Sequence, residues 1–195
     1  MSSKTNTPIF MIALAVIVAG VAGAALVQAL PPTGDTEQDV AAADVQSTCF
    51  GSTATIQGSG TLMGTEGDDV IIGSNKRDSI DGLGGNDKIC GAGGDDSIFG
   101  RAGDDKLSGG PGNDPRIDGG PGNDRIEGGR DNDVLRGGNG DDLLLGGSGI
   151  DDLDGEKGID SLKGGAGTPD KCDGGDDTDQ DTADAVSCET VVRVP

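Results

Sequence analysis

The feature that most constrains this chain is a nine-residue repeat that runs through its middle. Eleven consecutive blocks begin at Gly64 and end at Lys163, ten of them nine residues long and one of ten. Every block opens with Gly and has Asp in its sixth place. The eighth place is Ile or Leu in ten blocks, and in the block from Gly109 the inserted Pro115 delays the aliphatic residue to Ile117. A fixed period of this kind predicts a repeat architecture.

Each place in the block has a physical reason. Glycines at the first and fourth places allow backbone conformations that other residues avoid, so the first six residues are expected to form a turn. The last three residues, such as Arg125-Ile126-Glu127, alternate outward, inward and outward, which is typical of a three-residue strand. Such a strand is unstable alone, but stacked coils would align the aliphatic residues into an interior ladder. We therefore expect an all-β fold of stacked coils with parallel strand pairing.

Composition agrees with this expectation and excludes several alternatives. The chain has 38 Gly among 195 residues, three Phe and no Trp, Tyr or His, so it lacks the side chains of an ordinary globular core. Its formal net charge is −21, which is also typical of acidic disorder, although disorder does not explain an aliphatic residue at a fixed phase. The acidic balance argues against nucleic acid as a partner, because binding phosphates requires an excess of Lys and Arg.

The repeated aspartates predict a metal site. Stacked coils would place the sixth-place carboxylates close together, where like charges repel or take up protons. Calcium relieves this repulsion, because Ca²⁺ accepts about six to eight carboxylate and carbonyl oxygens, whereas Mg²⁺ demands stricter octahedral geometry. The candidate ligands are Asp69, Asp78, Asp87, Asp96, Asp105, Asp114, Asp124, Asp133, Asp142, Asp151 and Asp160.

The block from Gly119 to Glu127, Gly-Gly-Pro-Gly-Asn-Asp-Arg-Ile-Glu, resembles the G-G-x-G-x-D-x-U-x nonapeptide of RTX, or haemolysin-type, calcium-binding proteins. The resemblance implies a parallel β-roll with two repeats per coil and Ca²⁺ between turns on the same side. It also implies that the sixth-place Asp and the carbonyls of the glycine loop are ligands, with on the order of nine shared sites. Lys76 and Asp131 stand where the pattern has Gly, which weakens the expectation for their two loops.

The first thirty residues predict export. Residues 9–27 carry no charge, follow Lys4, and precede a small-residue cleavage position after Ala29. We expect residues 1–30 to be a signal peptide, with an uncleaved signal-anchor that holds the chain to a membrane through residues 9–27 as the alternative. Residues 31–48 are expected to be a flexible acidic linker. The protein would then be secreted, or extracellular at the cell surface if the first segment is retained.

Cysteine usage agrees with an exported chain. An even number of cysteines outside the cytoplasm predicts disulfides, and four cysteines allow three pairings. Their positions near the two ends of the repeats favour one disulfide per end, Cys49 with Cys90 and Cys172 with Cys188. A zinc site is a poor alternative, because the chain has no C-x-x-C pair and no His.

The segments that flank the repeats are expected to be caps. Residues 49–63 should extend the ladder without binding an ion, because Gly60 stands where Asp belongs. Residues 164–195 contain a degenerate repeat, in which Asp170 comes one place late and Cys172 occupies the apolar place, followed by a tail. Pro115 is expected to bulge one strand.

A last acidic cluster follows the degenerate repeat. We interpret it as a solvated tail, with a loose calcium site as the alternative. The cluster consists of Asp176, Asp177, Asp179 and Asp181.

These observations favour a non-catalytic, exported calcium-binding repeat protein. Without His, none of the serines near the turns has a base that would activate it, so we expect no enzyme. One alternative is a cell-surface adhesion or interaction module in which calcium is structural, with a protein or glycan partner that the sequence does not identify. Another is an accessory or remnant of an RTX-type secreted enzyme or toxin.

Overall fold

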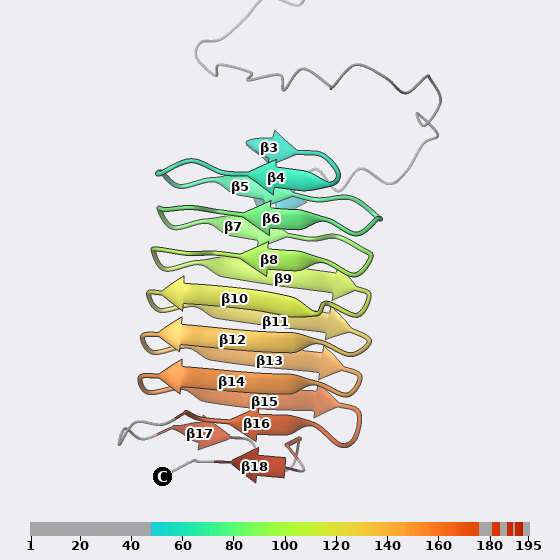
Figure 1. Cartoon of the computed structure of the whole chain (residues 1–195), viewed down its shortest axis with the longest axis vertical. Coiled ribbons are helices and arrows are strands. Elements are labelled where there is room, and N and C mark those ends of the chain that lie inside the picture. The colour runs from blue at the N-terminus through green and yellow to red at the C-terminus, as the bar shows by residue number, and fades with distance from the viewer. Residues whose placement is uncertain (1–47, 176–180, 184–186, 189, 193–195) are drawn as a thin grey trace, which may run out of the picture. The chain divides into compact units, whose positions relative to one another are not determined.

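The computed structural model describes residues 48–175, 181–183, 187–188 and 190–192, which wind into a parallel β-roll (Figure 1). One eight-stranded sheet contains β3 (Ile56–Gln57), β5 (Val70–Ile72), β7 (Lys88–Cys90), β9 (Lys106–Pro111), β11 (Arg125–Arg130), β13 (Leu143–Ser148), β15 (Ser161–Ala166) and β17 (Thr182–Ala183). The facing eight-stranded sheet contains β4 (Thr61–Met63), β6 (Ser79–Asp81), β8 (Ser97–Phe99), β10 (Arg116–Pro121), β12 (Val134–Asn139), β14 (Asp152–Lys157), β16 (Lys171–Asp173) and β18 (Thr190–Val192). The predicted all-β roll is confirmed.

Each coil of the roll contains two repeats. Paired residues lie 18 positions apart, as in Ile71 opposite Ile89, so successive blocks alternate between the two sheets. Across the insertion the spacing is 19, with Ile98 opposite Ile117. Pro115 lies before β10 and outside the strand, so the bulge predicted there is wrong. Because Pro has no N–H to donate, it is accommodated ahead of the first ladder residue.

The strands of the eleven repeats, β5 to β15, have two lengths. The predicted three-residue strand is found from β5 to β8, but β9 to β15 each have six residues. The longer strands include the first three places of the next block, and Gly129, in the second place, lies opposite both Gly110 and Gly147. The expectation that these glycines belong only to turns is therefore wrong for the later coils. Their pairing adds backbone hydrogen bonds to each coil.

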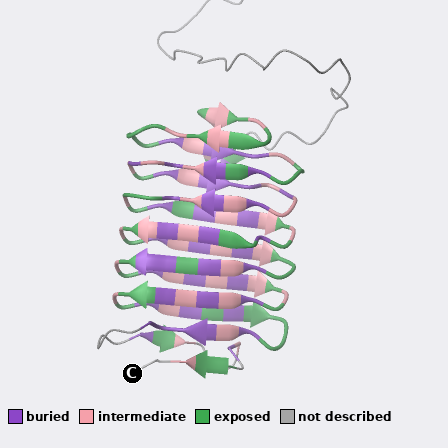
Figure 2. Cartoon of the chain, viewed as in Figure 1, coloured by how far each residue is buried: buried purple, intermediate pink, exposed green. Residues whose placement is uncertain are grey.

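The core is a single ladder of aliphatic side chains between the two sheets. Eleven Ile and Leu side chains, from Ile71 to Leu162, are at most 1% exposed, and Cys172 continues the ladder. Figure 2 shows the buried residues as a band through the middle of the strands. Burying each of these side chains contributes about 1.5–3 kcal/mol relative to leaving it in water. The ladder therefore stabilises the stack of coils.

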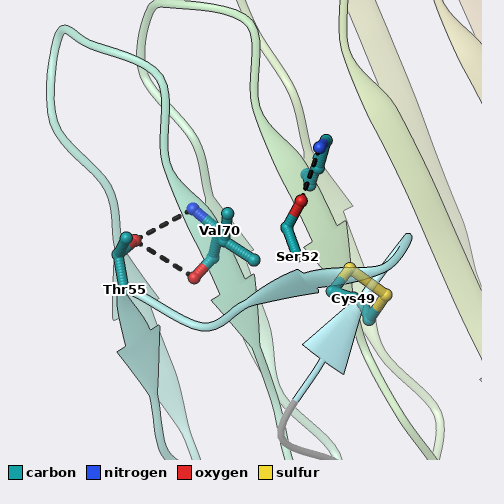
Figure 3. The surroundings of a disulfide bond; sticks show 6 residues. Cys49, Ser52, Thr55 and Val70 are labelled. Atoms are coloured by element: carbon teal, nitrogen blue, oxygen red, sulfur yellow. Dashed lines mark hydrogen bonds between the residues drawn. A yellow bond between two sulfur atoms is a disulfide. The ribbon is translucent and has the colours of Figure 1, made fainter.

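The N-terminal end carries a hairpin on the outside of the first sheet. Strands β1 (Thr48–Cys49) and β2 (Ser52–Thr53) pair antiparallel, and Cys49 forms a disulfide with Cys90 of β7. The hairpin covers Ile72, which is 1% exposed although its strand position faces outward. Figure 3 shows this disulfide beside Ser52 and Thr55. As predicted for residues 49–63, β4 extends the ladder by pairing with β6.

The C-terminal end is closed by a second disulfide. Cys172 of β16 lies opposite Leu153 in the apolar place and is bonded to Cys188. Both predicted disulfide pairings are thus confirmed. Among the described residues, no helix is long and apolar enough to cross a membrane. The predicted export segment and linker lie outside the described residues up to position 47, and Thr48, the last residue of that linker, belongs to β1.

Candidate metal centre

The sixth-place aspartates stand where each turn enters its strand. Their backbones belong to the ladders: the carbonyl oxygen of Asp124, for example, accepts the N–H of Leu143 at 2.9 Å. Their side chains point into the roll, and all eleven predicted ligands are at most 8% exposed. The turn and the strand together therefore bury a carboxylate at every half coil.

The buried carboxylates form two columns. In each, Oδ1 of one aspartate accepts the backbone N–H of the aspartate one coil earlier, as when Asp142 accepts from Asp124 at 2.7 Å. One column contains Asp69, Asp87, Asp105, Asp124, Asp142, Asp160 and Asp181. The other contains Asp78, Asp96, Asp114, Asp133, Asp151 and Asp170. All eleven aspartates predicted from the sequence lie in these columns.

Two members of the columns were not among the predicted ligands. Asp170 is 0% exposed and Asp181 is 4% exposed, so interpreting Asp181 as part of a solvated tail is wrong. Asp176, Asp177 and Asp179 lie outside the described residues. The spacing to the apolar place would have identified both. Cys172 lies two positions after Asp170, and Ala183 lies two positions after Asp181, as Ile or Leu does in the regular blocks.

The second carboxylate oxygen distinguishes most of these aspartates from ordinary buried ones. Within the described ranges, the buried Oδ2 atoms of eight aspartates accept no hydrogen bond. These eight are Asp87, Asp96, Asp105, Asp114, Asp124, Asp133, Asp142 and Asp151. A buried polar atom without a partner is costly, so such atoms in a repeated pattern point to a missing ligand.

The Oδ2 atoms face backbone oxygens of the next coil. A Cβ added to Gly128 would lie 2.5 Å from Oδ2 of Asp133 and 2.6 Å from the carbonyl oxygen of Gly146. Both oxygens therefore adjoin the space that the missing side chain of Gly128 leaves. In the loop from Gly137, Gly138 and Gly140 adopt φ of 122° and 132° and face the carbonyl oxygens of Gly120 and Gly122 in the coil before.

Burial changes the protonation of these carboxyls. Desolvation is the largest cause, and it raises the pKa of Asp142 to about 8, although the hydrogen bond from the Asp124 backbone lowers it. The neighbouring carboxylates of Asp124 and Asp160 raise it further. Burial also raises the pKa of Asp133 to about 8, of Asp96, Asp105 and Asp124 to about 7, and of Asp87, Asp114 and Asp151 to about 6.

These observations fit a hard cation between the coils. The donors are carboxylate and carbonyl oxygens, the ligand types that Ca²⁺ prefers, and a positive charge would relieve the desolvated carboxylates. Among the residues that the structure describes, no three His, Cys, Asp or Glu side chains lie together as a set that could hold a metal ion. An ion bound here would therefore need carbonyl oxygens of the glycine loops in addition to the aspartates.

Asp131 and Lys76, which stand in the fourth place where the repeat has Gly, differ in backbone conformation. Asp131 adopts a φ of 73°, and its carbonyl oxygen faces Gly149, as the fourth-place glycines of neighbouring coils do. The loop from Gly128 therefore keeps the common backbone conformation. Lys76 does not adopt a positive φ, and its loop differs from the later ones.

The fifth-place residues do not join the interior columns. They lie at the outside of the loops, where the side-chain oxygen accepts the fifth-place N–H of the next coil. Asn123, for example, accepts from Asp141 at 2.8 Å. These ladders of Asp and Asn are exposed or half-buried and have their own backbone partners. The candidate site therefore consists of the sixth-place aspartates and the loop carbonyls.

Comparison with known proteins agrees with this site. No curated protein matches the chain. The family model of the RTX calcium-binding nonapeptide repeat matches in four copies, at residues 63–98, 91–114, 118–153 and 145–181. These matches span the coils that hold the two aspartate columns. The chain therefore belongs to the RTX calcium-binding nonapeptide repeat family.

Proposed function

We propose that this protein is an exported, non-catalytic calcium-binding β-roll in which several Ca²⁺ ions between the turns drive folding. The observation that carries the proposal is the repeated, buried Oδ2 atom that has no hydrogen-bond partner in the eight aspartates from Asp87 to Asp151. Ca²⁺ would supply positive charge and a coordination partner to these atoms.

Calcium binding is coupled to folding because the ligands of each site come from two neighbouring coils. A site between two coils exists only when both coils are wound, so an ion bound there stabilises the folded chain over the unfolded one. Without the ion, the carboxylates must be buried charged beside one another or take up protons. The interior Ile and Leu ladder favours winding, and the aspartate columns oppose it until a cation is bound.

Calorimetric titration of the chain with calcium, followed in parallel by circular dichroism, tests the proposal. We expect several ions to bind with a gain of β-structure, and a much weaker response to magnesium because of its stricter geometry. Absence of binding at millimolar calcium would refute the calcium function. A chelator-treated chain that already has the full β-signal would refute the coupling to folding.

Export is supported by the uncharged run at residues 9–27, the preceding Lys4 and the two disulfides. Disulfides persist mainly in oxidising compartments. Fractionation of the producing cells, with sequencing of the mature N-terminus, tests this part. A new N-terminus at Leu30 indicates a secreted form, an intact one at the membrane indicates an anchored surface form, and a reduced cytoplasmic protein contradicts export.

A second candidate, a surface interaction module with structural calcium, is favoured by one observation. The register stacks Lys88, Lys106 and Arg125 in neighbouring strands on the outer face of one sheet. Arg125 is paired with Glu127 and Lys88 donates to Ser52, so an anionic partner would add to contacts that already offset part of this row's charge. Salt-sensitive retention of the calcium-loaded protein on a sulfated polysaccharide, lost in a triple Ala variant, would support this role. Unchanged retention would dismiss it.

A further inference from the structure

The first two loops of the repeat satisfy their aspartates internally. Oδ2 of Asp69 accepts the backbone N–H of Thr65 at 2.7 Å and its hydroxyl at 2.9 Å. In the next loop, Oδ2 of Asp78 accepts the backbone N–H and hydroxyl of Ser74 at 2.6 and 2.9 Å. Thr65 and Ser74 occupy the second place of their blocks, where later blocks have no hydroxyl.

The remaining carboxylate oxygens of these two aspartates also have donors. Oδ1 of Asp69 accepts the hydroxyl of Thr55 at 3.2 Å, and Oδ1 of Asp78 accepts the backbone N–H of Gly60. Both donors come from the segment that precedes the repeats. Neither carboxylate therefore needs a cation to satisfy its oxygens, in contrast to the eight from Asp87 onward.

The backbone of these loops independently shows the same division. In the loop from Gly82, Leu83 and Gly85 adopt φ of 76° and 102°, whereas Thr65 and Gly67 do not adopt the left-handed conformation. A Cβ on Gly85 would lie 2.5 Å from a backbone carbon of Gly67, but one on Gly67 would meet only the Thr65 hydroxyl, at 3.9 Å. The contact at Gly85 is with the hydroxyl loop from Gly64 itself, so these loops differ from the later ones in backbone conformation and in having no earlier repeat loop on their other side.

Features that need no metal stabilise the same end of the roll. The Cys49–Cys90 disulfide links the hairpin to β7, and Cys49, Ile72 and Cys90 form a second buried apolar cluster. The Thr55 hydroxyl also accepts the N–H of Val70, as Figure 3 shows, and the Val70 carbonyl is the alternative acceptor to Asp69 Oδ1 for its single proton. The described residues contain no equivalent cluster at the other end.

We propose that the loops from Gly64 and Gly73 use side-chain hydroxyls in place of calcium. Residues 48–90 then remain folded without the ion and form the template on which the later coils wind when calcium binds. Asp69 and Asp78 are structural aspartates in this arrangement. The inference rests on the proposed calcium function for the later coils only, because the hydroxyl loops are expected to persist in chelator.

Hydrogen exchange of the full chain in chelator and in calcium tests this inference. In chelator we expect slow exchange in strands β4 to β7 and fast exchange in β9 to β15, with all of them protected in calcium. Equally fast exchange of the two groups in chelator, with both protected in calcium, would overturn the inference. Protection of the later strands that does not respond to calcium would instead overturn the proposed function, so the two failures are distinguishable.

A double variant, Thr65→Gly with Ser74→Gly, tests the role of the hydroxyls. It gives both loops the glycine found at this place in later blocks, so we expect protection of β4 to β6 in chelator to fall by at least about tenfold. Calcium should restore protection, with more ions bound per chain than in the parent. The control is Ser148→Gly, which removes an exposed hydroxyl at the end of β13 and should change neither quantity.

Two outcomes of the variant experiment would contradict the proposal. Unchanged protection in chelator would mean that the hydroxyls do not hold these coils. Failure of the double variant to fold even in saturating calcium would mean that the ion cannot substitute for them.

Discussion

At the scale of single residues, neighbouring acids in one block have different roles. Asp141 is exposed, and its Oδ1 accepts the N–H of Ile159 at 2.9 Å. Asp142 is 3% exposed, its pKa is raised by burial, and its Oδ2 accepts no hydrogen bond. The two residues have the same side chain, so their surroundings alone separate a backbone cap from a candidate ligand.

This difference gives a matched pair of substitutions. Asp142→Asn removes a ligand charge and should raise the calcium concentration needed for half-maximal folding by about tenfold. Asp141→Asn removes the same charge from the loop surface and should have little effect, because Asn fills that place in other coils. Calcium titrations followed by circular dichroism compare them. Equal shifts in the two variants would indicate that only the net charge matters.

The raised pKa values predict how acid affects the calcium-free chain. An unfolded Asp has a pKa of about 3.9, whereas burial raises that of Asp133 and Asp142 to about 8. Because the folded state favours the protonated form, this contribution to stability is complete below about pH 4 and is lost as pH rises through about 6–8. In chelator, the β-signal should therefore be greater at pH 5 than at pH 8.5, and calcium should remove the difference.

An Asp133→Asn, Asp142→Asn double variant provides the control for this pH dependence. It removes the two carboxyls with the highest pKa. The β-signal in chelator should therefore fall less steeply with rising pH in the variant than in the parent. A pH profile that is identical in the variant and the parent would assign the effect to overall charge repulsion instead.

At the scale of one repeat, the first-place glycine links the turn to the site. Because this glycine has no side chain, a space remains beside it, as at Gly128. Two oxygens border the space: Oδ2 of the aspartate in the same block and a carbonyl oxygen of the next coil. Any side chain there would push the two coils apart. This is a steric requirement, because Gly128 itself has no left-handed φ.

Gly128→Ala should therefore destabilise the calcium-loaded roll. The added methyl would meet Asp133 Oδ2 and Gly146 O at 2.5 and 2.6 Å, and overpacking of this kind costs about 1–3 kcal/mol. The control is Gly67→Ala, where the nearest atom would be Thr65 Oγ1 at 3.9 Å. Urea unfolding in calcium measures both. A larger loss in the control than at Gly128 would contradict the assignment of this space.

At the scale of the whole roll, the two ends are closed by disulfides while the middle depends on the aspartate columns. The Cys49–Cys90 bond closes 41 residues of chain and the Cys172–Cys188 bond closes 16. Cys90 lies in β7 and Cys172 in β16, and each of these strands is paired on both sides within its sheet. Each disulfide therefore attaches a flanking segment to a coil near one end of the roll, inside the outermost strands.

Replacing each cysteine pair with serines should destabilise the roll through the entropy of the unfolded chain. The loop lengths predict losses of about 4 kcal/mol for the first disulfide and about 3 kcal/mol for the second. Chemical unfolding in calcium measures these losses. In chelator, only loss of Cys49–Cys90 should increase exchange in β5 to β7, and an equal effect of the second pair would contradict a separate N-terminal unit.

The sequence by itself determined the roll, its core and most of the candidate site. A fixed period places one aliphatic residue and one aspartate at the same phase of every half coil, and this local spacing decides which side chains face inward. The two disulfides followed from the positions of the cysteines near the ends of the repeats. The pairing of Thr61–Met63 with β6 could also be predicted, because this segment keeps the period of the repeats.

Only the tertiary structure decided which aspartates have partners for both oxygens. The donors to Asp69 and Asp78 include atoms from a coil 14 to 18 residues earlier, so no inspection of one block reveals them. Asp170 and Asp181 joined the columns because strand pairing sets the register, and extra residues are accommodated in the turns before them. Sequence period specifies the coil, whereas contacts between coils decide which oxygens remain for an ion.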